Sequence, residues 1–248
     1  MEWYWILLIV LGSILLLFIL TVLFYKQFFK RFWDFVLSLI AIIVLSPLLL
    51  ILTIVGAIAM RGNPFFVQKR PGKNERIFNL IKFRSMSNKK DKDGNLLSDE
   101  QRLGKYGKIL RSTSLDELPE LLNVVLGSLS LVGPRPLLIK DLVFMNQAQR
   151  KRHVVRQGIT GLAQINGRNN ITWEQKFEYD SKYIEHVTFF GDIKILLLTV
   201  FKVFKREDVV REGTVSDLDF GDWLLANGKV SKKEYDKKIE DAKVILNG

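Results

Sequence analysis

The chain has 248 residues, of which 48% are hydrophobic, and it contains no cysteine and only two histidines. The absence of cysteine excludes disulfides, thiolate nucleophiles, iron–sulfur clusters and cysteine-type zinc sites, and two histidines argue against an all-histidine metal site. The formal net charge is +11. Residues 61–112 hold 14 Lys and Arg against 5 Asp and Glu, a net charge of +9. Such a surplus attracts phosphate, which an anionic lipid, a nucleic acid or a phosphorylated small substrate can supply.

Residues 3–24 form an uncharged apolar segment with about the length of a membrane-spanning helix. Aromatic residues lie near both of its ends, as in an interfacial belt. Only Glu2 precedes the segment, whereas Lys26, Lys30 and Arg31 follow it, so the positive-inside rule predicts that the N-terminus lies outside and Lys26 in the cytoplasm. A cleaved signal peptide is the alternative, but its basic residues would precede the apolar stretch.

A second apolar segment, Trp33 to Met60, contains Ser46 and Pro47 near its middle. A proline-kinked spanning helix is the commoner structure for such a sequence, but basic residues flank this segment on both sides. If the helix breaks at Ser46-Pro47, each half is about 20 Å long, too short for a membrane core of about 30 Å. We therefore expect a re-entrant helix with both ends in the cytoplasm, in which the Ser46 hydroxyl bonds to a carbonyl one turn back.

After Met60 the pattern changes to short alternating runs and amphipathic stretches. Residues 64–72 and 76–86 predict two strands with a turn at Pro71-Gly72, and residues 87–102 predict an exposed loop. Helical periodicity follows at 102–111, 118–127, 171–187 and 192–205, and two short helices about Gly228 end the chain. The expected fold is α+β and membrane-associated, with an N-terminal membrane helix (1–29), a re-entrant helix (30–60), a compact, mainly helical domain with a β-hairpin (61–213) and a C-terminal helical extension (214–248).

Two adjacent carboxylates, Asp116 and Glu117, lie in the stretch RSTSLDELP. Ser114 has the capping-box spacing to Glu117, and Pro119 is comfortable only in the first turn of a helix, so the simplest interpretation is a helix start. Adjacent helical residues point about 100° apart. One carboxylate can therefore attack as a nucleophile while the other holds a cation.

Two loops downstream each present one arginine. Arg135 stands between two prolines, and Arg168 follows a glycine-rich run at 158–167. The planar guanidinium suits phosphate oxygens or a pyrimidine edge. There is no Walker P-loop and no G-x-G-x-x-G motif, so nothing indicates an NTPase or a dinucleotide-binding protein.

Seven ordered motifs closely resemble the bacterial sugar transferase family of monotopic phosphoglycosyl transferases: KRFWDF, the Ser46-Pro47 pair, IKFRSM, RSTSLDELP, LVGPRP, GITGLAQINGRN and DIKILLLT. The resemblance covers roughly residues 30–213. It implies a re-entrant helix in the bacterial inner membrane and a catalytic domain at 61–213 that faces the cytoplasm. It also implies transfer of a phosphosugar from a UDP-sugar to polyprenol phosphate with Mg²⁺, among membrane lipids and without a nucleic-acid partner.

Carried onto this sequence, the resemblance makes Asp116 the nucleophile that attacks the β-phosphorus, releases UMP and becomes a phosphosugar-aspartate. Glu117, together with Asp116, would bind Mg²⁺. A carboxylate attacks phosphorus only when cationic groups neutralise the diphosphate. The implied substrate- and phosphate-binding residues are Lys82, Arg111, Arg135, Arg168 and Asp180, and the role of Asp180 is unspecified.

Two other functions stay open on the sequence alone. One is a non-catalytic membrane scaffold that binds anionic lipid, and the other is a glycosyltransferase that releases UDP instead of UMP. The C-terminal residues 223–246 are similar to small oligomerisation modules, which implies a homo-oligomer, and a solvated helical tail is the alternative. Identifying the nucleotide product, UMP or UDP, best separates the two catalytic functions.

Overall fold

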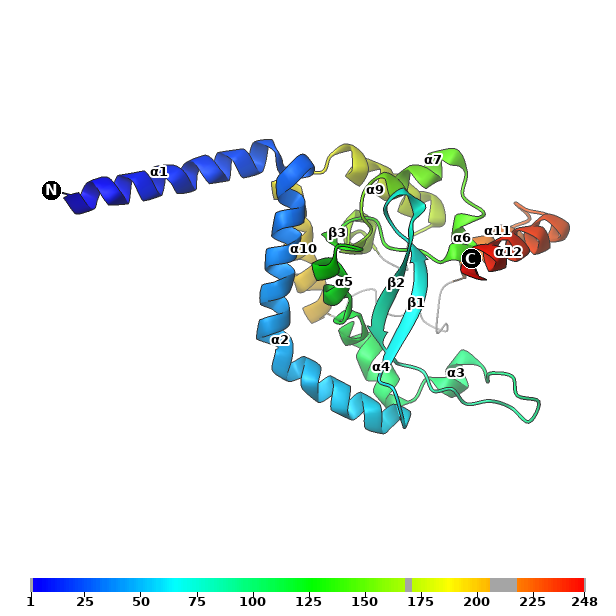
Figure 1. Cartoon of the computed structure of the whole chain (residues 1–248). Coiled ribbons are helices and arrows are strands. Elements are labelled where there is room, and N and C mark those ends of the chain that lie inside the picture. The colour runs from blue at the N-terminus through cyan, green and yellow to red at the C-terminus, as the bar shows by residue number, and fades with distance from the viewer. Residues whose placement is uncertain (1, 168–170, 206–217, 248) are drawn as a thin grey trace.

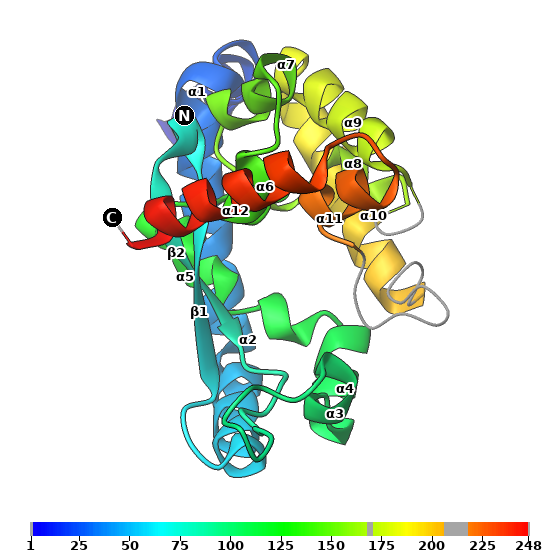
Figure 2. The same cartoon turned by 90° about the vertical axis from the view of Figure 1, so that its right-hand side faces the viewer.

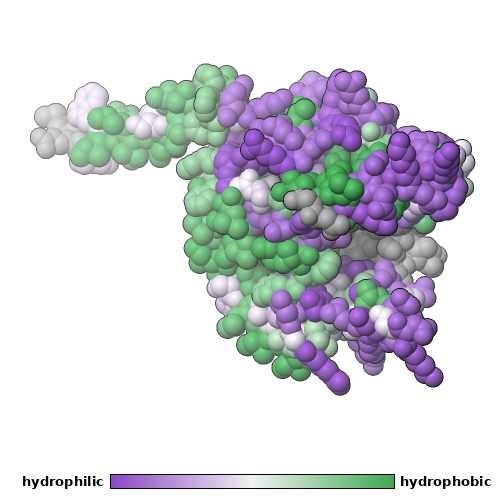
Figure 3. All heavy atoms as spheres, turned by 45° about the vertical axis from the view of Figure 1, so that its right-hand side comes forward, coloured by the Kyte–Doolittle hydropathy of each residue, from purple (hydrophilic) through white to green (hydrophobic). Residues whose placement is uncertain are grey.

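A computed structural model describes residues 2–167, 171–205 and 218–247 of the chain. Two apolar helices come first, α1 (Glu2–Leu23) and α2 (Lys30–Met60), joined by a π-helical turn, η1 (Tyr25–Phe29). Both are long and apolar enough to cross a membrane, with mean hydropathies of 3.2 and 3.0. Figure 1 shows α1 extending away from a compact domain and α2 running along one side of it. The surface over these two helices is largely apolar in Figure 3, which is compatible with a membrane-associated chain.

The domain that follows consists mostly of short helices around two small sheets. In chain order its elements are β1 (Phe65–Pro71), η2 (Lys73–Glu75), β2 (Ile77–Phe83), α3 (Asp99–Arg102), α4 (Lys105–Ser112), η3 (Leu115–Glu117), α5 (Glu120–Leu126), β3 (Ser130–Val132), α6 (Ile139–Leu142), α7 (Gln147–Arg150), η4 (Lys151–Val154), β4 (Gly158–Thr160), α8 (Leu162–Ile165), α9 (Trp173–Glu185), α10 (Phe189–Lys205), α11 (Phe220–Ala226) and α12 (Lys232–Asn247).

The helix α2 is continuous although Pro47 lies inside it. We expected it to break at Ser46-Pro47, and instead Figure 1 shows one helix that bends partway along its length. The Ser46 hydroxyl donates to the carbonyl oxygen of Ile43 at 2.8 Å, which confirms the expected bond one turn back. Proline removes one backbone hydrogen bond and crowds the preceding turn, so a helix held by its neighbours bends there without ending.

Both ends of α2 pack against the same domain. Near its start, Arg31 donates to the carbonyl oxygens of Val124 and Val125 at 2.5 and 2.7 Å. Near its end, the Tyr106 hydroxyl donates to the carbonyl oxygen of Leu52 at 3.3 Å. The domain thus holds the helix at two places, one before the bend and one after it.

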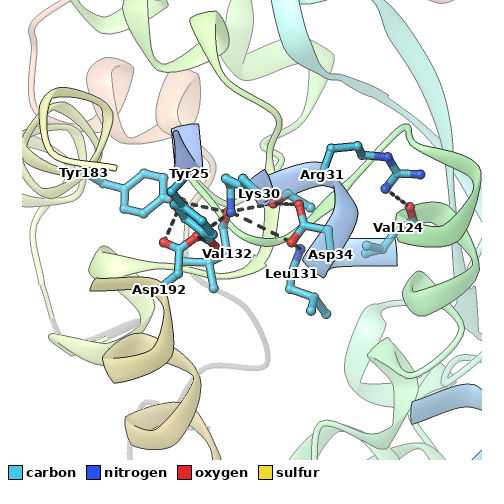
Figure 4. Close-up of polar contacts among 10 residues, drawn as sticks. Tyr25, Lys30, Arg31, Asp34, Val124, Leu131, Val132, Tyr183 and Asp192 are labelled. Atoms are coloured by element: carbon cyan, nitrogen blue, oxygen red, sulfur yellow. Dashed lines mark hydrogen bonds and ion pairs between the residues drawn. The ribbon is translucent and has the colours of Figure 1, made fainter. Parts of the chain in front are cut away.

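A buried carboxylate on α10 fixes the turn between the two apolar helices (Figure 4). Asp192 accepts hydrogen bonds from the Tyr25 hydroxyl at 2.8 Å, from Lys30 at 2.5 Å and from the Tyr183 hydroxyl at 3.0 Å. Its exposed fraction is only 2%. Because a buried carboxylate needs several donors, the convergence of these three side chains is what allows α10 to pack here.

A second buried carboxylate, Asp34 in the first turns of α2, completes the same network. It accepts from the Ser130 hydroxyl at 2.7 Å and from the backbone amide of Leu131 at 3.1 Å. The network therefore links the sequence motifs at 30–35 and 192–199, which lie far apart along the chain. We call it the anchor cluster, and its members are Tyr25, Lys30, Asp34, Ser130, Tyr183 and Asp192.

The predicted hairpin is confirmed, because β1 and β2 pair antiparallel about the turn η2. A second sheet, the parallel pair β3 and β4, was not predicted, since strands of three residues are too short to show alternation. Two loops meet beside it. A Cβ on Gly161 would lie 2.1 Å from the carbonyl oxygen of Gly133, so only glycine allows this approach. The contact positions the loop of residues 133–138, which we call the PRP loop.

The two C-terminal helices α11 and α12 dock on the domain and are not a solvated tail. Phe220 and Val230 are buried in one apolar cluster with Phe144 and Trp173. Figure 2 shows both helices lying across one side of the domain. The predicted turn between them is confirmed at Gly228, which has a φ of +66°.

Candidate active site

The adjacent carboxylates Asp116 and Glu117 lie in η3, one short turn ahead of α5. The capping box that we predicted does not form, because Ser114 has a φ of +56° and its side chain makes no capping hydrogen bond. Glu117 instead turns its carboxylate toward two cations. Charge-assisted bonds of this kind are stronger than a neutral cap bond, which explains the difference.

The two cations come from distant parts of the chain. Lys82 of β2 lies 3.0 Å from Glu117, and Arg135 of the PRP loop lies 2.5 Å from the same oxygen. Lys82 also pairs at 2.9 Å with Glu120, which is 2% exposed. Sequence reasoning missed Glu120, although its spacing of three residues from Glu117 indicates a shared helical face. We call Lys82, Asp116, Glu117, Glu120 and Arg135 the active-site cluster.

Electrostatic partners keep the cations of this cluster charged. Burial alone lowers the pKa of Lys82, but Glu117 and Glu120 outweigh it, and the net shift is upward. Glu117 raises the pKa of Arg135 above its ordinary value, against the effect of burial. Burial and the neighbouring Glu117 raise the pKa of Glu120, and Lys82 opposes them. The cluster thus holds two permanent positive charges beside its carboxylates.

Asp116 differs from its neighbour because it forms no hydrogen bond or ion pair with any residue that the structure describes. Its pKa is raised by burial and by Glu117, while Lys82, Arg135 and Arg111 act in the opposite direction. The Asp116 carboxylate is half-buried, and the cations around it lie beyond hydrogen-bonding distance. A carboxylate in this state is available to a ligand.

Arg111 lies close enough to influence Asp116, although it does not pair with it. The guanidinium Nε donates to the Ser85 hydroxyl at 3.0 Å, which fixes the side chain at the end of α4. Arg168, which the sequence also suggested, lies outside the described residues. The structure therefore brings together Lys82, Arg111, Asp116, Glu117 and Arg135 from the predicted set.

Asp180 lies behind the cluster, where it supports the PRP loop. It is 4% exposed and accepts from the Arg152 Nε at 2.9 Å. Burial raises the pKa of Asp180, and Arg152 opposes this shift. Arg152 in turn donates to the backbone carbonyl of Arg135 at 2.7 Å. The structure thus connects Asp180 to the active-site cluster through the backbone of the PRP loop.

Two further side chains brace the same loop. Arg70 donates to the carbonyl oxygen of Pro136 at 3.2 Å. Asp141 accepts from the backbone amides of Leu138 at 2.9 Å and Phe220 at 2.8 Å, so it ties the PRP loop to the start of α11. Burial and Asp219 raise the pKa of Asp141 to about 6. The docked C-terminal helices therefore reach the active-site cluster through one carboxylate.

The acidic side chains of the site limit the kind of metal ion that it can hold. No group of three or more His, Cys, Asp or Glu side chains suited to a metal occurs in the described ranges. Mg²⁺ commonly takes one or two carboxylates and completes its shell with water and substrate phosphates. Asp116 and Glu117 offer that donor set, so the residues present fit a Mg²⁺ ion that binds together with a diphosphate.

Comparison with known proteins places this chain in a family. The family model for bacterial sugar transferases matches residues 25–206 of this chain. An uncharacterised sugar transferase of Bacillus subtilis is 46% identical over 187 residues, which cover 75% of this chain and 93% of the relative. The UDP-glucose:undecaprenyl-phosphate glucose-1-phosphate transferase of Klebsiella pneumoniae is 40% identical over 186 residues, which cover 71% of this chain and 40% of that longer protein. An exopolysaccharide production protein of Rhizobium meliloti is 31% identical over 188 residues, which cover 69% of this chain and 83% of the relative.

The matched range begins at η1 and ends after α10, so α1 and the C-terminal helices lie outside it. The active-site cluster and the anchor cluster lie inside it. Because the family model covers well over half of the chain, the chain belongs to the bacterial sugar transferase family and is a transferase enzyme.

Proposed function

We propose that this enzyme transfers a sugar-1-phosphate from a UDP-sugar to polyprenol (undecaprenyl) phosphate and releases UMP. The similarity to the UDP-glucose:undecaprenyl-phosphate glucose-1-phosphate transferase of Klebsiella pneumoniae supports this reaction type. One observation carries the assignment of residues: Asp116 is a half-buried carboxylate without a partner among the described residues, next to Glu117, which two cations already hold. The unpaired carboxylate is the nucleophile in this proposal.

In the first step a carboxylate oxygen of Asp116 attacks the β-phosphorus of the UDP-sugar. The bond from that phosphorus to the bridging oxygen breaks, and UMP leaves with the electron pair. Lys82, Arg111 and Arg135 stabilise the charge that develops on the diphosphate oxygens. Only the ionised carboxylate attacks, so its raised pKa predicts that turnover falls at a higher pH on acidification than an ordinary aspartate would give.

In the second step an oxygen of polyprenol phosphate attacks the same phosphorus. The bond from phosphorus to the Asp116 oxygen breaks, the polyprenol diphosphate sugar forms, and the carboxylate returns to its starting state. The enzyme thus splits one displacement into two, which is the usual benefit of a covalent intermediate.

Asp116 and Glu117 would hold Mg²⁺ in this scheme. A bound Mg²⁺ supplies charge neutralisation to the phosphate oxygens. The variant Glu117→Gln should retain part of the turnover, and its activity should rise with added Mg²⁺, because charge neutralisation is weakened and the nucleophile is intact. A Glu117→Gln enzyme whose turnover is indifferent to Mg²⁺ across the whole titration would contradict this role.

We further propose that α2 is re-entrant and that the domain faces the cytoplasm at the inner membrane. Contacts at both ends of α2 with one domain support this topology, because a straight crossing of about 30 Å would separate those ends. Single cysteines at Gln27 and Asn63 in this cysteine-free chain should react with an impermeant thiol reagent from the same side of the membrane. Labelling from opposite sides would reject the re-entrant arrangement.

The central test uses the enzyme with UDP-sugar and Mg²⁺ but without polyprenol phosphate. We expect a burst of UMP near one equivalent and the mass of one phosphosugar added to the peptide that contains Asp116. Release of UMP only when acceptor is present, with an unchanged protein mass, would favour direct transfer in one ternary complex. Release of UDP would overturn the phosphosugar transfer itself.

A further inference from the structure

A second basic site lies at the turn of the hairpin, away from the active-site cluster. A cavity of about 370 Å³ opens there between η2 and the residues that follow α5. Three cationic side chains line it, Lys73, Arg76 and Arg156. No carboxylate belongs to the lining, and Glu75, the acidic residue of the turn, pairs with Arg150 at 2.8 Å.

Among the residues that the structure describes, these cations have no counterion. Within the described ranges Lys73 and Arg76 form no ion pair, and Arg156 uses only its Nε, which donates to the carbonyl oxygen of Gly127 at 2.9 Å. Arg31 also lies against Gly127, since a Cβ there would meet its Nη2 at 3.2 Å. Positive charges gathered at one cavity repel each other, and a bound anion would remove that cost.

The position of the cavity close to the apolar helix α2 indicates where the anion comes from. Arg31 belongs to the first turn of α2, which is one of the two apolar helices. Leu126, the last residue of α5 and the neighbour of Gly127, is an apolar side chain that is 76% exposed. The cavity therefore lies beside the boundary between the apolar surface and the polar domain, where lipid headgroups would lie.

We propose that this cavity binds the phosphate of an anionic phospholipid, of which phosphatidylglycerol is the test case. Lys73, Arg76 and Arg156 hold the phosphate, and the partly exposed apolar side chains Ile77 and Phe78 border the path of an acyl chain. The site is distinct from the active-site cluster, because Arg76 precedes Lys82 by six residues of nearly extended strand, about 20 Å. A phosphate bound here would lie too far from Asp116 to be the acceptor that receives the sugar.

The test titrates the full-length enzyme in neutral detergent with phosphatidylglycerol and follows the thermal midpoint by tryptophan fluorescence. Phosphatidylglycerol should raise the midpoint of the unchanged enzyme, and phosphatidylcholine should not. In Lys73→Gln/Arg76→Gln/Arg156→Gln the apparent affinity for phosphatidylglycerol should fall by on the order of a hundredfold. The double variant Lys73→Gln/Arg76→Gln, which leaves the Arg156 hydrogen bond in place, should lose an intermediate share of the affinity.

A matched control removes the same charge elsewhere. Lys89→Gln/Lys90→Gln/Lys92→Gln changes three exposed lysines of the 87–102 loop, and its response to phosphatidylglycerol should equal that of the unchanged enzyme. All variants should keep their basal UMP release. An equal loss of affinity in the control, a response to phosphatidylcholine, or an equal response to inorganic phosphate at the same concentration would each overturn the lipid site.

Discussion

The anchor cluster and the active-site cluster are built from the same kinds of charged side chain and differ in how completely they are satisfied. In the anchor cluster Asp192 receives three donors and Asp34 receives two, and both carboxylates are almost fully buried. In the active-site cluster Glu117 and Glu120 share Lys82, Asp116 accepts no hydrogen bond from any described residue, and the Arg135 side chain is 41% exposed. Buried charges that are fully paired hold a structure together, whereas an unpaired carboxylate among cations is left for a substrate.

The sharpest way to separate the two clusters is Asp116→Asn. Turnover should fall by at least about a thousandfold, because an amide is a very poor nucleophile toward phosphorus. The thermal midpoint at neutral pH should not fall, since burial already disfavours the charged carboxylate at this position. Steady-state UMP release and thermal unfolding measure the two effects. Asp93→Asn in the exposed loop is the matched control, and turnover within tenfold of normal in Asp116→Asn would remove the proposed nucleophile.

The opposite pattern should follow from Asp34→Ala in the anchor cluster. It leaves the Leu131 amide without its acceptor and removes one acceptor of the Ser130 hydroxyl, and removing one partner of a buried charged network costs about 3–5 kcal/mol. Denaturant unfolding in detergent should report that loss, while the molecules that remain folded keep turnover within a few-fold of normal. Asp34→Asn, which retains an oxygen acceptor, should lose less. Full stability with abolished turnover in Asp34→Ala would reverse the contrast between the two clusters.

A third change, Gly221→Val, reaches the active-site cluster through the packing of α11. A Cβ on Gly221 would lie 2.4 Å from the Phe144 ring, so Gly221→Val should push α11 away from the domain. Overpacking of this kind costs about 1–3 kcal/mol. Because Asp141 links α11 to the PRP loop, kcat should also fall severalfold.

Gly62→Val is the matched control for that change, since a Cβ at Gly62 meets nothing within 4 Å. It should alter neither stability nor kcat. If Gly221→Val lowers stability without any effect on kcat, the C-terminal helices do not act on the PRP loop.

The smallest expected effect is a pH dependence of stability that comes from Asp141. Its pKa is raised to about 6 in the folded state, above the usual value of about 3.9 for an unfolded aspartate. Its contribution to stability is therefore complete below the unfolded value and is lost as the pH rises through 6. The free energy of unfolding should gain about 1 kcal/mol from this group between pH 7 and pH 5.

The difference between the unchanged enzyme and Asp141→Asn isolates that contribution, because the other carboxylates titrate in both proteins. The free energy of unfolding of the unchanged enzyme, relative to that of Asp141→Asn, should be about 1 kcal/mol higher at pH 5 than at pH 7. A difference that does not change with pH would mean that the environment of Asp141 leaves its affinity for protons unaltered.

Local patterns in the sequence were sufficient to predict the helices and strands that depend mainly on residues close together along the chain. Apolar length predicted α1 and α2, alternation about Pro71-Gly72 predicted the hairpin, and periodicity predicted α9, α10 and the C-terminal pair. The adjacent carboxylates at 116 and 117 were also visible, since they are adjacent in the chain itself. The resemblance to the sugar transferase motifs added the roles, which no local pattern contains.

Only the tertiary structure decided which charges are paired. Glu117 does not form the predicted capping box because it binds Lys82 and Arg135, which lie 35 and 18 residues away along the chain. The short parallel pair β3 and β4 exists because two loops meet, and α2 remains one bent helix because the domain holds it on both sides of Pro47. Whether a carboxylate becomes part of the scaffold or stays free for a substrate depends on donors contributed by other elements, and the sequence around that carboxylate does not contain them.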